Sequence, residues 1–309
     1  MQAFLIRRLL SFIPTMLLFY TLIFGLIQLT PGNPWDNADK PFRPEVMEEL
    51  RAKYHLNYPI WKQYLDYLRR AVFHFDFGPS YKRNLDANQV ISRFFPVSLE
   101  LGAVAFVLAV LGGITLGVVA AVNQNSIIDR LATFFSVIGV ATPSFVVITL
   151  MVITLAVDWR VLPAFGWSGL FSTKLIIPAI ALSLGPMSLI ARYARASMLE
   201  TIRADYVRTA RAKGLTERTV ILRHGLRNAL IPVTTVSGVA LADLITGSFF
   251  VEAIYGVPGI GRYFVSTVSD RDYPVLMAVT LLFAALIWLM NFVSDVAYAL
   301  IDPRVRIAP

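Results

Sequence analysis

Six long stretches of this 309-residue sequence carry almost no charged side chain, and this feature constrains the fold more than any other. The hydrocarbon core of a membrane is about 30 Å thick and takes roughly 20 apolar residues of helix to cross. The stretches have about this length, and 56% of the chain is hydrophobic, more than a soluble domain can bury. We therefore predict an all-α membrane protein with six transmembrane helices. Their predicted ranges are Leu9 to Leu29, Leu101 to Val122, Leu131 to Val157, Leu175 to Ala191, Ala229 to Val251 and Tyr273 to Ser294.

The first stretch could instead be a cleaved signal peptide, because Arg7 and Arg8 precede it. Its apolar core is too long for that, and no small-x-small cleavage site follows. Only one charged residue, Asp243, falls within the six stretches. A carboxylate inside a membrane is costly, so Asp243 should face the bundle or a partner, where it either makes a structural hydrogen bond with Ser, Thr or backbone or contacts the substrate's amino group in a possible substrate pathway.

Positive charge predicts the orientation of the helices. If the amino terminus is cytoplasmic, the inner segments are 1–8, 123–130, 192–228 and the tail after Ser294, which contain 14 Lys and Arg residues. The outer segments also contain 14, but 10 of them lie in the long loop from Thr30 to Pro96, and long loops cross membranes largely regardless of charge. The short loops therefore favour a cytoplasmic amino terminus, and we predict that both termini are cytoplasmic. We interpret the basic 192–228 segment as a cytoplasmic loop rather than a nucleic-acid surface.

The chain reads as a single membrane domain, 1–309, with an N-terminal helix (1–29), an extracytoplasmic loop (30–96) and a five-helix core (97–309). Apolar residues recur at helical spacing after Pro44 and Pro59, which predicts two short amphipathic helices in the outer loop. These helices either cap the outer mouth of the bundle or dock a partner that delivers substrate.

The inner loop, 192–228, predicts a helical hairpin. Ile202, Tyr206 and Ala210 recur every four residues, so we expect a helix from Glu200 to Lys213. Gly214 follows at the position where helices end in a left-handed turn.

A second helical stretch is predicted after Thr216, a suitable N-cap, through Val220 and His224 toward Pro232. Small residues would allow another surface to approach the first helix closely; they are Thr209, Ala210, Ala212 and Gly214. The alternative is an amphipathic helix that lies on the bilayer.

Several kinds of chemistry lack the residues they need. The chain has no cysteine, and its three histidines lie outside the six stretches, so we predict no metal site and no catalytic residue. There is no G-x-x-x-x-G-K-[ST] sequence to cradle nucleotide phosphates. Gly256, Pro258, Gly259 and Gly261 follow no strand and are interpreted as an outer turn rather than a phosphate loop.

At the inner loop the sequence resembles the permease subunits of bacterial ABC importers, and among them the peptide and nickel group. The stretch Asp205-Tyr206-Val207-Arg208-Thr209-Ala210-Arg211-Ala212-Lys213-Gly214-Leu215 is similar to the EAA motif of that family. In the family this motif forms the coupling helix that sits in a cleft of the ATPase subunit. Ala210 and Gly214 match the motif's final alanine and its glycine, whereas its glutamate is replaced by Arg208. Pro232 matches the closing proline only loosely.

The resemblance extends over the whole chain. Its further motifs are Arg7-Arg8, Thr30-Pro31-Gly32, Asp76-Phe77-Gly78-Pro79-Ser80, Gly256-Val257-Pro258-Gly259-Ile260-Gly261, Arg271-Asp272-Tyr273-Pro274 and Asp302-Pro303-Arg304. The stretch from Pro44 to Leu56 resembles in particular the B-type subunit of oligopeptide permeases, although dipeptide, glutathione and nickel permeases share most of this framework.

The resemblance implies a multi-pass protein of the bacterial inner membrane with the architecture of a type I importer permease. It implies a homologous second permease subunit, two ATPases that hold ATP and Mg²⁺, and an extracytoplasmic peptide-binding protein, with no cofactor on this chain. The coupling residues would be Tyr206, Arg208, Thr209, Ala210, Lys213, Gly214 and Leu215. The alternative from another class is an ion-coupled secondary transporter. Proton relays usually contain several ionisable residues within the membrane, however, and this chain has a single intramembrane carboxylate.

Overall fold

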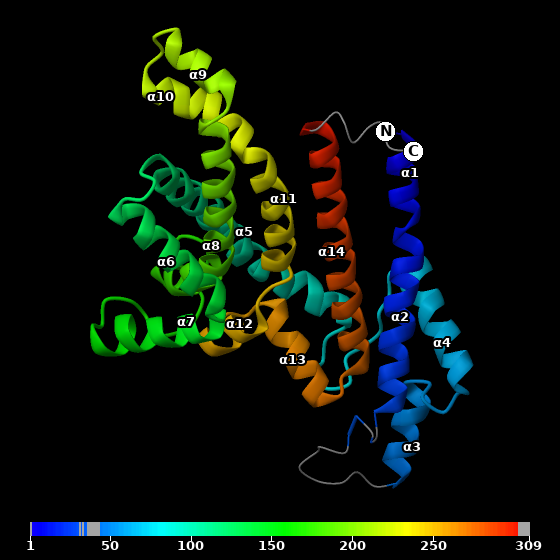
Figure 1. The fold of residues 1–309 in the computed structure, drawn as a ribbon. Coiled ribbons are helices and arrows are strands. Elements are labelled where there is room, and N and C mark those ends of the chain that lie inside the picture. Colours follow the sequence, from blue (N-terminus) through cyan, green and yellow to red (C-terminus); the bar gives the residue numbers. More distant parts are fainter. Residues whose placement is uncertain (1, 31, 33, 36–43, 302–309) are drawn as a thin grey trace.

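The computed structural model describes residues 2–30, 32, 34–35 and 44–301, which fold mainly into helices (Figure 1). The start of α1 and the end of α14 lie at the same end of the molecule as α9 and α10, and α3 and α13 lie at the opposite end (Figure 1). Two of the sequence motifs are therefore only partly described or not described at all. Pro31 and the Asp302-Pro303-Arg304 motif lie outside the described residues.

Five helical segments are long and apolar enough to cross a membrane, in agreement with five of the predicted spans. They comprise α1 (Gln2–Leu10) with α2 (Phe12–Leu29), α5 (Ala87–Val122), η3 (Thr173–Leu175) with α8 (Ile176–Ile202), α10 (Glu217–Thr219) with η4 (Val220–Gly225) and α11 (Leu226–Ile245), and α14 (Tyr273–Ile301). The inner-loop helix α9 (Asp205–Ala212) connects α8 to α10.

The remaining predicted span, Leu131 to Val157, is not one straight helix. It consists of α6 (Ile127–Ala141) and α7 (Ser144–Met151) with η2 (Val152–Asp158), and the two arms are bent by 108°. Pro143 lies at the bend and disfavours helical backbone at Thr142, whose φ and ψ of −92° and 119° are extended. Six spans are therefore present only if this bent pair counts as one, and the expectation of a continuous helix is wrong.

The predicted span Ala229 to Val251 also ends earlier than expected. α11 stops at Ile245, and Gly247 follows with a positive φ of 83°. The chain then forms α12 (Phe249–Tyr255) and α13 (Ile260–Asp270) before α14 begins. An apolar composition alone did not reveal this break, because α12 is as hydrophobic as the span that precedes it.

Close contact between α5 and α8 forms the centre of the molecule. Small residues recur every three or four positions along the buried face of α5, including Gly102, Ala105, Ala109, Gly113, Gly117, Ala120 and Ala121. A Cβ atom added at Gly113 would lie 2.7 Å from Ile190, and one added at Gly117 would lie 2.5 Å from the carbonyl oxygen of Ala191. Such contacts between backbones are the usual way in which helices associate where water is absent.

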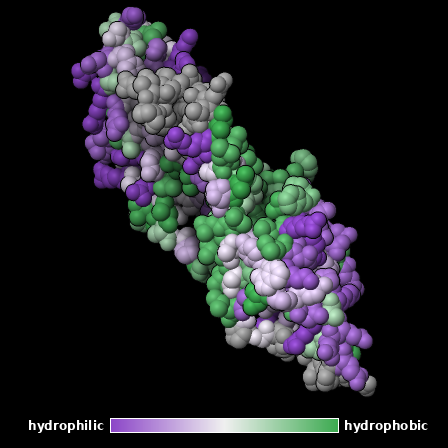
Figure 2. Space-filling model, turned by 90° about the vertical axis from the view of Figure 1, so that its right-hand side faces the viewer, coloured by the Kyte–Doolittle hydropathy of each residue, from purple (hydrophilic) through white to green (hydrophobic). Residues whose placement is uncertain are grey.

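The outer segment folds onto its own chain. The two predicted helices are α3 (Pro44–Lys53) and α4 (Ile60–Arg69), and η1 (Arg70–His74) continues α4. The Tyr20 hydroxyl on α2 donates a hydrogen bond of 2.7 Å to the carbonyl oxygen of Tyr64 on α4. Tyr67 and Leu68 pack with α2 and with Met277 of α14. Figure 2 shows that, on this side of the molecule, hydrophobic side chains form a band between two hydrophilic ends.

Candidate coupling segment and transport pathway

In the hairpin, the helix predicted from Glu200 to Lys213 is interrupted. α8 ends at Ile202, and α9 begins at Asp205 after the extended residue Ala204, which has φ −68° and ψ 148°. Asp205 lies in the first turn of α9, where a carboxylate stabilises the helix dipole. Because of this break, α9 changes direction relative to α8 and projects from the end of the bundle (Figure 1).

The buried face of α9 packs against the start of η4, in the returning half of the hairpin. Val207, Ala210 and Val220 form a small apolar cluster in which Ala210 is only 5% exposed. The small side chain of Ala210 therefore packs inside the hairpin and is not available for contact with a partner. The other assigned coupling residues are exposed: Tyr206, Arg208, Thr209, Lys213, Gly214 and Leu215.

The turn after α9 has the predicted form. Gly214 adopts a positive φ of 78°, and no atom lies within 4 Å of a Cβ added there, so a side chain would be opposed by the backbone conformation alone. The Arg211 guanidinium and the Glu217 carboxylate, 2.7 Å apart, close the hairpin. Thr216 precedes α10 as predicted, but its hydroxyl pairs with that of Thr219 and forms no cap to a backbone N–H group. Pro232 lies within α11.

Asp243 lines a hollow where two breaks between helices meet α8. Thr142 and Ser144 come from the bend between α6 and α7, Gly185 and Pro186 from α8, and Ser248 from the start of α12. The hollow measures about 260 Å³, and Asp243 is exposed. It thus combines a carboxylate with several hydroxyl groups in a region otherwise built from apolar helices.

The outer turn encloses a carboxylate that the sequence analysis missed. Glu252 on α12 is completely buried and accepts hydrogen bonds from the Ser98 hydroxyl at 2.7 Å and from the Arg262 N–H group at 3.0 Å. Ser98 in turn accepts one from the Ile260 N–H group at 2.8 Å. A Cβ atom at Gly259 would lie 2.5 Å from the carboxylate, so the glycine makes room for Glu252.

Two of the motifs that carry the family resemblance meet at the outer end. Asp272 is completely buried and accepts hydrogen bonds from the Ser80 hydroxyl and from the Tyr81 N–H group. Burial raises the pKa of Asp272, whereas these hydrogen bonds and the nearby Arg83 guanidinium oppose that rise. The contact fixes the start of α5 to the start of α14.

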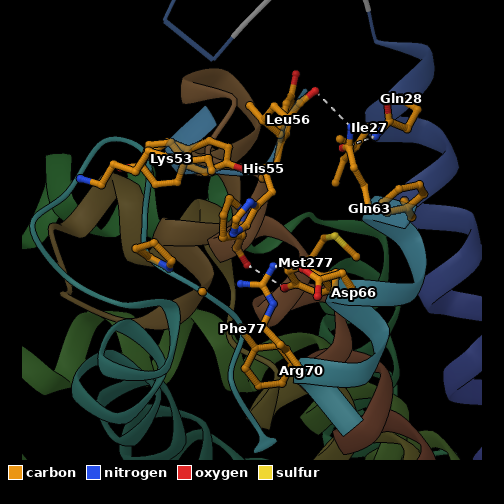
Figure 3. A pocket seen from close by; sticks show the side chains of 18 residues that line it. Ile27, Gln28, Lys53, His55, Leu56, Gln63, Asp66, Arg70, Phe77 and Met277 are labelled. Carbon is orange, nitrogen blue, oxygen red and sulfur yellow. Dashed lines mark hydrogen bonds and ion pairs between the residues drawn. The ribbon is translucent and has the colours of Figure 1, made fainter. Parts of the chain in front are cut away.

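A separate outer pocket of about 140 Å³ lies between α2, α4 and α14 (Figure 3). The Arg70 guanidinium forms an ion pair of 2.6 Å with Asp66 within it. Gln63 donates a hydrogen bond of 3.2 Å to the carbonyl oxygen of Leu56, which ties the loop before α4 to that helix. The pocket lies on the opposite side of the molecule from α6 and α7, so we do not include it in the pathway.

These features define a class: an integral membrane transport subunit with an exposed hairpin at one end and a polar hollow among its helices. Residues 113–307 match the family described as binding-protein-dependent transport system inner membrane component, and residues 1–102 match the N-terminal family of that membrane component. The chain belongs to this family and is a multi-pass inner-membrane protein. The family resemblance drawn from its motifs is confirmed.

Two curated relatives match along the whole chain. The dipeptide transport system permease protein DppB of Bacillus subtilis (strain 168) is 42% identical over 308 residues, with 99% of both chains covered. The oligopeptide transport system permease protein OppB of Escherichia coli (strain K12) is 45% identical over 307 residues, covering 99% of this chain and 100% of that one.

Among solved structures, a chain of the inward-facing MetNI methionine ABC transporter is similar, with a TM-score of 0.56 and 20% identity. The match covers 69% of this chain and 96% of that one. At this identity the likeness concerns the fold, and it supports the type I importer permease architecture.

Proposed function

We propose that this chain is one transmembrane subunit of an ATP-driven importer that carries dipeptides or oligopeptides into the cytoplasm. The observation that carries the proposal is the identity of 42% and 45% to dipeptide and oligopeptide permeases over 99% of the chain. In this proposal the chain pairs with a homologous permease, makes and breaks no covalent bond and binds no cofactor. ATP and Mg²⁺ belong to two separate ATPase subunits, and an extracytoplasmic binding protein delivers the peptide.

The exposed face of α9 is the proposed contact with the ATPase. Arg208 and Lys213 are exposed at the tip of the hairpin, and Tyr206 is held in place by a hydrogen bond of 2.8 Å that the Asn228 side chain donates to its hydroxyl. The buried contact of Ala210 with the returning segment makes the hairpin one rigid unit. A rigid tip can pass a displacement of the ATPase on to α8.

The hollow at Asp243 is the proposed part of the pathway on this chain. Its carboxylate suits a substrate with a protonated amino group, and the nearby hydroxyl groups of Thr142, Ser144 and Ser248 suit peptide N–H and carbonyl groups. The Gly256 to Gly261 turn is proposed to face the binding protein, with Glu252 holding it in shape.

Purification and reconstitution test the proposal directly. A tagged chain should copurify with a P-loop ATPase and a second permease, and proteoliposomes should take up labelled dialanine or trialanine only with ATP and binding protein. The matched control is a complex whose ATPase lacks its P-loop lysine. Uptake driven by a proton or sodium gradient without ATP would contradict the proposal in favour of a secondary transporter, and uptake of Ni²⁺ or glutathione instead of peptide would replace the substrate class.

A further inference from the structure

An ion pair joins α6 to α8 near the inner end of the molecule. The Arg195 guanidinium donates two hydrogen bonds to the Asp129 carboxylate, from Nε at 2.6 Å and from Nη2 at 2.8 Å. Asp129 is only 4% exposed and also accepts a hydrogen bond of 2.9 Å from the Asn125 N–H group. Such a bidentate contact between charged groups fixes the relative orientation of the two side chains as well as their separation.

Between this ion pair and the bend, a hollow lies beside α6. A hollow of about 140 Å³ that opens to the surface lies between Thr133 and Ser136 of α6, Gly117 of α5 and Ala191 of α8. The side chains that face this hollow lack packing partners on that side. Near the bend α6 and α8 are in close contact, since a Cβ atom added at Gly139 would overlap the Ser188 hydroxyl oxygen.

The ion pair lies on a continuous path from the hairpin to the hollow. Arg195 is two turns, or about 10 Å, before the end of α8, and α9 begins three residues after that end. Asp129 is in the first turn of α6, and the other end of α6 carries Thr142 into the hollow beside Asp243. At the end of α8, Arg203 adds a hydrogen bond of 3.1 Å to Gln124, in the loop before α6.

We propose that Asp129 and Arg195 are positioning residues that transmit a displacement of α9, through α8, to α6 and thereby reshape the hollow at the α6–α7 bend. This inference rests on the proposed function, since it requires α9 to be moved by an ATPase. The hollow beside α6 leaves space for the helix to shift, and the ion pair makes α6 follow α8.

Charge substitution in the reconstituted complex tests this link. Asp129→Asn and Arg195→Gln should keep the ATPase bound and its hydrolysis stimulated by loaded binding protein within about twofold, while trialanine uptake per ATP falls by about tenfold or more. The exchange Asp129→Arg with Arg195→Asp should restore most of that uptake, because it restores the pair. Arg192→Gln, an exposed arginine one turn earlier on α8, is the matched control and should keep wild-type uptake.

A distance measurement gives a readout that a merely structural role would not move. The chain has no cysteine, so spin labels at Phe134→Cys on α6 and Val119→Cys on α5, both exposed, report the displacement of α6 relative to α5. The label separation should change between nucleotide-free and ATP-trapped complexes, and Asp129→Asn should abolish the change.

Wild-type uptake per ATP in both single variants overturns the link, as does a nucleotide-dependent separation that persists in Asp129→Asn. Loss of subunit assembly that the charge exchange does not repair also overturns it, because the pair would then serve folding only. The wild-type complex distinguishes a failure of this link from a failure of the proposed function. In the second case the wild-type complex itself would purify without an ATPase or take up no peptide.

Discussion

At the scale of single residues, the two carboxylates around α12 have opposite surroundings. Asp243 is exposed in a hollow lined by hydroxyl groups, whereas Glu252 is fully buried and has its hydrogen bonds supplied by Ser98 and a backbone N–H group. A buried carboxylate with a hydrogen bond to each of its oxygens holds a structure together, and one left exposed can meet a substrate. The structure therefore separates a candidate pathway residue from a structural one.

Replacement of Asp243 by Asn tests the pathway residue. The change keeps the shape but removes the charge, so loss of a charge-assisted hydrogen bond of about 1.5 to 3 kcal/mol should reduce the apparent affinity for trialanine by roughly tenfold or more. Uptake by proteoliposomes over a range of peptide concentrations measures this. Asp158→Asn, exposed at the end of η2, is the control. Unchanged uptake by Asp243→Asn would leave that carboxylate with no role in contacting the substrate amino group.

Replacement of Gly259 by Ala tests the structural carboxylate. The added methyl group would lie within 2.5 Å of Glu252 and Ser98, so the outer turn must shift, at a cost of about 1 to 3 kcal/mol. The purified complex should melt at a lower temperature. Gly25→Ala, on α2 with no atom within 4 Å of the new methyl group, should melt at or slightly above the wild-type temperature. Equal melting of the two variants would contradict the packing described here.

At the scale of helices, α9 has two faces with different tasks. One face buries Val207 and Ala210 against Val220 within the hairpin, and the other presents Arg208 and Thr209 to the surface. A charge introduced at Ala210 would be buried without a partner and would disrupt the hairpin whether or not an ATPase binds it. The exposed face is therefore the place where docking can be tested alone.

Arg208→Glu makes that test. Reversal of an exposed charge leaves the hairpin intact but should weaken ATPase copurification by about tenfold or more and reduce stimulated hydrolysis with it. Arg160→Glu, the same change in an exposed outer segment, should have no effect on either measurement. If Arg208→Glu instead lowers only the association of the chain with lipid, α9 is a membrane-surface helix.

At the scale of the whole molecule, five of the six predicted spans agree with the structure, because composition alone decides which segments prefer lipid. The bend at Thr142-Pro143 was missed, since an uncharged run was treated as a straight helix although it contained a proline. The burial of Glu252 was hidden because its partner Ser98 is distant in the chain and only folding brings the two together. The burial of Ala210 within the hairpin could not be predicted, because α9 is shorter than the predicted helix and follows a change of direction at Ala204.

The orientation of the molecule in the membrane stays a prediction from the distribution of Lys and Arg. Asn84 lies in the outer segment before α5 and Glu217 begins α10 in the inner hairpin, and both are exposed. Since the chain has no cysteine, single variants Asn84→Cys and Glu217→Cys are the only thiols it carries. Because short loops rich in basic residues stay cytoplasmic, Asn84→Cys should react with an impermeant maleimide in intact spheroplasts and Glu217→Cys only after lysis. Labelling of detergent-solubilised protein controls for reactivity, and both cysteines should react there. The reverse pattern in intact spheroplasts would place α9 outside, where no cytoplasmic ATPase could reach it.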